Sequence, residues 1–217
     1  MKKKKKNIYE NYFGRNIARI IYVISWSLLV YGAFNIVVGN SYWGAIYCTI
    51  GILPFFLTYH KQVSDKSIDE LVNKSVEDYL KNNIKGKMIG KRELNPADFS
   101  VFSGFIRENS DVRFKSCRDG KLRTSQYYVT AISVNRTECI ISTTIYNMLS
   151  EDSPVEKFFH VNVSDIIGFN EKESEFPKGN FECNLLASKD GENQQYVFYL
   201  PAGDYLVGRI IEQIKSL

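Results

Sequence analysis

The chain has 217 residues, of which 28 are basic and 24 acidic, so its formal net charge is +4. A chain of this length holds one ordinary domain plus a small one, or two small domains. The positive charge belongs to the N-terminus: residues 1–19 carry seven basic residues against one acid, whereas residues 61–217 carry 21 basic against 23 acidic residues. Because the main part of the chain is slightly acidic, we do not expect it to bind a nucleic-acid polymer.

Residues 1–15 form a basic tail with five consecutive lysines after the first methionine. Such runs occur in nuclear addresses, nucleic-acid patches, signal peptides and membrane-surface anchors. Because an apolar stretch follows, we interpret the tail as an anchor on the cytoplasmic leaflet, where each lysine contributes up to about 1 kcal/mol. The predicted anchor residues are Lys2, Lys3, Lys4, Lys5, Lys6, Arg15 and Arg19.

Residues 16–60 are predicted to form a hairpin of two transmembrane helices. The last 41 of them contain no Asp, Glu, Lys or Arg, and a Gly-Asn-Ser turn at 39–41 separates apolar runs at 20–38 and 42–59. As helices these runs would be roughly 27–28 Å long, close to the ~30 Å hydrocarbon core of a bilayer. Small residues on the second run would allow close contact with the first helix or with another copy of the chain, which leaves a homo-oligomer as an open alternative.

Basic residues flank this hairpin on both sides and the turn carries none. The positive-inside rule therefore predicts a cell-membrane protein with two spans and both termini in the cytoplasm. A signal peptide is an alternative, but the first run is long, lacks a clear A-x-A site and is followed by a second run. A buried hairpin of a soluble protein is a further alternative, although a charge-free stretch leaves no helix face for water.

Residues 61–86 are predicted to form an amphipathic connector helix, with Ser67 and Glu70 as a capping box and Gly86 as its stop. The helix would either transmit orientation from membrane to domain as a stalk or pack on the following domain. We favour packing, because fewer than three heptads do not establish a coiled coil.

Residues 87–217 are predicted to form a β domain. Short runs of alternating apolar residues, separated by turn signals such as Asp119-Gly120 and Asp190-Gly191, predict seven or eight antiparallel strands. An amphipathic helix follows Pro201. This order predicts a small barrel or sandwich with a C-terminal helix. The predicted strands cover 99–108, 112–117, 124–134, 137–148, 156–163, 166–172, 181–189 and 194–200.

Three stretches carry a resemblance: YYVTAISVNRTECIIS, FFHVNVSDIIGF and QQYVFYLPAGDYLVGRIIEQI. They resemble a hairpin, an apolar strand with its turn, and the last strand and helix of pleckstrin-homology (PH) and GRAM-like domains, including bacterial PH-like domains. The resemblance covers roughly residues 110–217 and implies a PH-like cytosolic domain. The strand predicted at 99–108 departs from the minimal seven strands of that fold, which leaves another small barrel open.

Enzyme signatures such as G-x-x-x-x-G-K-[ST], H-E-x-x-H and G-x-S-x-G are absent from the sequence. The four cysteines form no C-x-x-C pair, and His60 and His160 stand alone. We therefore expect no catalytic residues, no metal site and no cofactor.

The resemblance also implies a candidate site. Phosphoinositide-binding PH domains carry a K-x(n)-[K/R]-x-R pattern across their first hairpin, and Lys115, Lys121 and Arg123 match it, with Arg118 in the turn. A hairpin of this kind gathers cations around one loop, which suits a phosphate group. The alternative is a hairpin with ordinary solvated surface cations.

Two functions remain open at this point. The first is a non-enzymatic integral membrane protein whose PH-like module binds a protein, a lipid or a small anionic ligand. The second is a membrane effector of the antiphage type, in which a β-barrel senses a cyclic nucleotide and drives the helices to assemble and disrupt the membrane.

Overall fold

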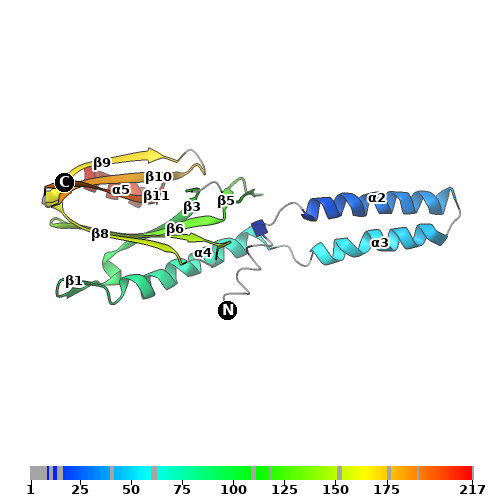
Figure 1. Ribbon diagram of the computed structural model, residues 1–217, viewed down its shortest axis with the longest axis horizontal. Helices are drawn as coiled ribbons and strands as arrows, with labels where there is room; N and C mark the ends of the chain where they lie inside the picture. The colour runs from blue at the N-terminus through cyan, green and yellow to red at the C-terminus, as the bar shows by residue number, and fades with distance from the viewer. Residues whose placement is uncertain are drawn as a thin grey trace. The chain divides into compact units, whose positions relative to one another are not determined.

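The computed structural model describes residues 9, 12–13, 17–39, 42–59, 63–108, 111–117, 119–150, 153–174, 177–189 and 191–216. Its contacts divide the chain into two compact units, Met1–Ser64 and Asp65–Leu217. Helices and strands of both units are labelled in Figure 1. The predicted anchor residues Lys2–Lys6 and Arg15 lie outside the described residues, as does the side chain of Arg19.

The first unit contains helix α2 (Ile17–Val37) and helix α3 (Tyr42–Tyr59), which pack closely against each other. A Cβ atom added to Gly32 would lie 2.8 Å from the carbonyl oxygen of Gly44, and one added to Gly51 would lie 2.9 Å from that of Ser25. Ser25 and Gly32 are seven residues apart, as are Gly44 and Gly51. The spacing places small residues of antiparallel helices opposite one another every two turns, so the two backbones meet directly.

The prediction of two transmembrane helices is wrong. Within the described residues, only the window Ile20–Val37 of α2 is long and apolar enough to cross a membrane, and 11% of that window is buried. Helix α3 does not qualify as a second candidate span within the described residues. The two-span localisation is wrong for the same reason: one candidate span does not require both termini to lie on the same side. Because α2 lies near the N-terminus, a signal sequence fits it as well.

The second unit contains two larger antiparallel sheets. The first has the strand order β3-β6-β7-β8 and the second the order β11-β10-β9. Their bounds are β3 Ser100–Ile106, β6 Gln126–Val134, β7 Glu138–Asn147, β8 Val155–Asn162, β9 Ile166–Glu173, β10 Asn180–Lys189 and β11 Glu192–Pro201.

Two small hairpins complete the strands: β1 (Met88–Ile89) with β2 (Arg92–Glu93), and β4 (Phe114–Ser116) with β5 (Leu122–Thr124). The eight predicted strand segments overlap β3, β4 and β6 to β11, whereas β5 was not predicted as a separate strand. The fold class built from them is wrong, because the β region forms several small sheets beside one candidate membrane helix. A 3-10 turn at Val163–Asp165 separates β8 from β9 and interrupts the ladder there.

The main core lies between the two larger sheets. Ile132 and Ile141 of the four-stranded sheet meet Leu185 and Phe198 of the three-stranded sheet, and all four are at most 2% exposed. Each such side chain stabilises the fold by about 1.5–3 kcal/mol through burial. Helix α5 (Tyr205–Lys215) adds a stripe of apolar residues to this core: Val207, Ile211 and Ile214.

Helix α4 (Asp65–Tyr79) and its π-helical continuation (Leu80–Ile84) cover the other face of the four-stranded sheet. The Tyr79 hydroxyl lies 2.7 Å from the Ser142 hydroxyl of β7. On β6, Val129 is fully buried on this face, whereas Ile132 is buried in the main core. The sheet is therefore covered on both faces, and α4 is a packed layer of the second unit rather than a stalk. The helix begins at Asp65, so the predicted capping box falls inside its first turn.

Candidate functional site

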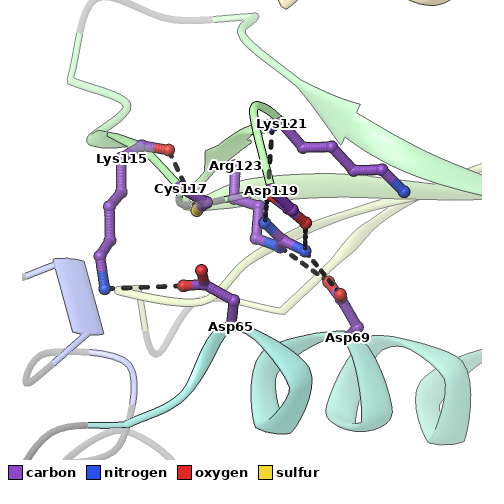
Figure 2. Close-up of polar contacts among 7 residues, drawn as sticks. All are labelled: Asp65, Asp69, Lys115, Cys117, Asp119, Lys121 and Arg123. Carbon is purple, nitrogen blue, oxygen red and sulfur yellow. Dashed lines mark hydrogen bonds and ion pairs between the residues drawn. The ribbon is translucent and has the colours of Figure 1, made fainter.

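The β4–β5 hairpin packs against the start of α4 and forms the candidate site with it (Figure 2). Its turn is built locally: Gly120 has a φ of +77°, its N–H donates to the Cys117 carbonyl, and the Lys121 N–H donates to the Asp119 carboxylate at 3.1 Å. A positive φ suits glycine because no Cβ clashes there. The turn therefore holds the Asp119 carboxylate in place near Arg123, four residues further along the hairpin.

Arg123 is the centre of the site. Its side chain is 2% exposed and its guanidinium group is bound on two sides by carboxylates. Nε and Nη2 donate to Asp69 of α4 at 2.8 and 2.6 Å, while Nη1 and Nη2 donate to Asp119 at 3.1 and 2.8 Å. Paired hydrogen bonds between guanidinium and carboxylate are the strongest and most directional that side chains form. Arg123 therefore joins the hairpin to α4.

These contacts also fix the charge state of the site. Hydrogen bonds from Arg123 are the main reason that the pKa of Asp119 falls from its ordinary value of 3.8 to about 2. The pKa of Arg123 is raised above its ordinary value, first by Asp69 and then by Asp119, with burial acting in the opposite direction. Arg123 and Asp119 are thus both ionised at neutral pH, and Arg123 lies between two carboxylates.

Further along the hairpin, Lys115 Nζ lies 3.8 Å from the Asp65 carboxylate, at the first residue of α4. The Cys117 thiol donates to the Lys115 carbonyl at 3.5 Å. In Figure 2 the Lys121 side chain extends away from the three carboxylates. Two of the hairpin cations therefore face acids of α4, and the third points elsewhere.

Lys115, Arg118, Lys121 and Arg123 were predicted to form an anion-binding loop. Arg118 lies outside the described residues. The guanidinium group of Arg123 is already occupied by carboxylates, and Lys121 does not converge with it. Anion binding stays a prediction, because nothing in this geometry tests it directly. Asp65 and Asp69 were not predicted as site residues, because each lies 50 or more residues before its partner in the chain.

Ligand atoms of Asp65, Cys117 and Asp119 lie within 4.8 Å of one another, a spacing that a metal ion would also accept. Both carboxylates are, however, already paired with cations: Asp65 with Lys115 and Asp119 with Arg123. A metal ion would have to compete with these ion pairs. We therefore interpret the arrangement as a set of structural ion pairs between the hairpin and α4, called the joint below: Arg123 with Asp69 and Asp119, and Lys115 with Asp65.

Comparisons of the chain with protein-family models, with curated proteins and with solved structures found no match. The PH-like resemblance therefore stays a prediction, and functional arguments rest on the geometry of this chain.

Proposed function

We propose that the protein is a non-enzymatic binding module attached to a membrane through α2, with the unit Asp65–Leu217 presenting the binding surface. The observation that carries the proposal is the exposure of α2, because only 11% of its charge-free window Ile20–Val37 is buried. Isolated apolar side chains are common on protein surfaces, but a contiguous apolar helix surface indicates contact with lipid or protein.

The exposed side chains of α2 are large. Val23, Val30 and Phe34 are each more than 60% exposed, and Trp26 is 61% exposed. Burying such side chains in hydrocarbon is favourable by about 25 cal/mol per Å² of apolar surface. The packing against α3 through the glycine contacts leaves this surface uncovered, so a lipid bilayer is the partner that explains it best.

The titratable groups of the second unit support a non-catalytic role. Burial raises the pKa of the Cys139 and Cys183 thiols to about 12, so both stay protonated in the core. Thiolate, not thiol, is the reactive form of cysteine. The most strongly perturbed carboxylate, that of Asp119, is paired with Arg123 and is therefore occupied by a structural contact.

The ion pairs of Arg123 hold the start of α4 against the β4–β5 hairpin within the second unit. Helix α4 starts at Asp65, directly after the end of the first unit, and Arg123 fixes it four residues later at Asp69. The second unit, Asp65–Leu217, would present the surface for a protein partner or a small anionic ligand.

The test is membrane fractionation of full-length protein followed by alkaline extraction. We expect the wild type to stay in the membrane pellet and the α2 variant Ile24→Arg/Val30→Arg to move to the supernatant, because charges at the centre of a membrane helix cost about 2.5–3.5 kcal/mol each. The matched control, Val155→Arg/Ile167→Arg, changes two equally exposed residues of the second unit and should stay in the pellet. Wild-type protein in the supernatant would overturn the proposal.

The cyclic-nucleotide effector hypothesis stays a prediction. A cyclic nucleotide that raises the melting temperature of the full-length protein would favour it over the module proposed here.

A further inference from the structure

A pocket of about 350 Å³ opens on the second unit, away from the joint at Arg123. It lies between the β1–β2 hairpin with its following turn and the β6–β7 hairpin. Its apolar lining comes from the buried Leu94 and Ile140 and the half-buried Phe99. Val134 also borders the pocket, but its side chain packs into the main core on the other face of β6. The volume lies within the range of about 300–1,000 Å³ that small-molecule sites occupy.

The rim of this pocket is acidic. It carries Glu93, Asp98 and Glu138 against one cation, Arg92, which is paired with Glu138. Glu138 is occupied by Arg92, and its second carboxylate oxygen lies 3.0 Å from His160 Nε2. Glu93 and Asp98 are exposed, and their carboxylates make no hydrogen bond or ion pair with another described residue. Two negative charges at the rim are thus available to a ligand.

The two loops that form the pocket are held in place by their own side chains. Asn135 Oδ1 accepts the backbone N–H groups of Thr137 and Glu138, both at 2.9 Å, and Asn95 Oδ1 accepts that of Ala97 at 3.1 Å. Gln213 of α5 donates to the Val134 carbonyl at 3.2 Å. A pocket whose walls are already ordered loses little conformational entropy when a ligand enters.

We propose that this pocket binds a basic side chain, lysine or arginine, from a partner polypeptide. Its aliphatic stem would lie on Phe99, and its cationic end would lie between Glu93 and Asp98. Long basic side chains have this division between an apolar stem and a charged end, so they match an apolar floor below an acidic rim. The inference deepens the proposed function, on which it rests, by naming the chemistry of the partner.

The test uses full-length protein in detergent micelles and a fluorescein-labelled peptide of alternating glycine and lysine, with norleucine replacing lysine in a second peptide. We expect the lysine peptide to bind and the norleucine peptide not to bind. Glu93→Gln/Asp98→Asn should weaken binding about tenfold, since each exposed ion pair contributes up to about 1 kcal/mol. Ser133→Leu, which narrows the pocket without changing charge, should weaken it too.

The matched control is Glu77→Gln/Asp111→Asn, which removes two exposed carboxylates outside the pocket. Its affinity should stay within about twofold of the wild type, since removing surface charges away from a site has small effects. Equal weakening in this control would show general charge attraction and would overturn the pocket. Unchanged binding in either pocket variant with a wild-type melting temperature would overturn it as well. Because binding is measured in micelles, failure here leaves the membrane proposal intact, and the fractionation result does not affect this test.

Discussion

Helices α2 and α4 have the same secondary structure and opposite surfaces. In α2 the apolar residues surround the helix, and the window Ile20–Val37 has no charged residue. In α4 seven of fifteen residues are charged, and Ile68, Val72 and Tyr79 are buried on one side. The difference shows that the distribution of apolar residues around a helix, rather than helix formation itself, decides whether the helix packs on its own domain or needs an environment other than water.

The largest effect should come from removing the buried side of α4. Ile68 is fully buried, so Ile68→Ala should cost about 2–5 kcal/mol through lost burial and a cavity. The same change on α2, Ile24→Ala at a position that is 54% exposed, should change the stability of the second unit by less than about 0.5 kcal/mol. Hydrogen exchange over β6 and β7 in denaturant measures both. Equal effects of the two variants would contradict the comparison.

The next effect concerns the ion pairs that fix α4. Asp69→Asn/Asp119→Asn leaves a buried guanidinium without a carboxylate and should destabilise the second unit more than Arg123→Met, which leaves two solvent-accessible acids. Thermal unfolding of the full-length variants gives the order of the two melting temperatures. A lower melting temperature for Arg123→Met would show that the joint acts through packing of the arginine stem and not through charge.

A smaller effect should appear with pH. The folded-state pKa of Asp119 is about 2 and its ordinary value is 3.8, so its contribution to stability is present above pH 3.8 and is lost as the pH falls toward 2. Chemical unfolding measured across this interval should show the loss in the wild type. In Arg123→Met the loss should be reduced, because the main cause of the shift is gone. An unchanged pH profile in the variant would contradict the assignment.

The smallest effect is a gain. Gly208 lies inside α5, and an added Cβ would meet no atom within 4 Å. Gly208→Ala should therefore stabilise the second unit by about 0.5–1 kcal/mol through helix propensity. A decrease in melting temperature would show that α5 contacts something at this position.

By contrast, Gly32→Ala in the pair of helices α2 and α3 should disturb their packing, because the added Cβ would lie 2.7 Å from Cys48 Sγ.

The strands were predictable because their signals are local. Alternating apolar residues and turn pairs such as Asp119-Gly120 identified β3, β4 and β6 to β11, whereas β1, β2 and β5 have only two or three residues each and were not predicted. The buried stripe of α4 was predictable from helical spacing. The assembly of the strands into separate sheets was not, since ladder breaks such as the turn at Val163–Asp165 depend on contacts between distant segments.

Of the residues that form the joint at Arg123, the sequence pointed to the cations but not to their acidic partners on α4. The sequence showed the cations of the hairpin, but Asp69 is 54 residues away from Arg123, and no local pattern links them. Asp119 is only four residues from Arg123, so its pairing across the hairpin had a signal in the sequence. The error over two spans has a different origin: absence of charge was treated as equal evidence for both apolar runs, whereas only the window Ile20–Val37 of α2 is a candidate span within the described residues.

The central claim is that α2 lies in a membrane, and tryptophan quenching tests it most directly. The chain has two tryptophans, so Trp43→Phe leaves Trp26, which is 61% exposed on α2. We predict that full-length Trp43→Phe protein in vesicles containing phosphatidylcholine with brominated acyl chains shows strong quenching of Trp26, with blue-shifted emission. Emission typical of water and unaffected by the brominated lipid would contradict the account, as would a mature protein from which Trp26 has been cleaved.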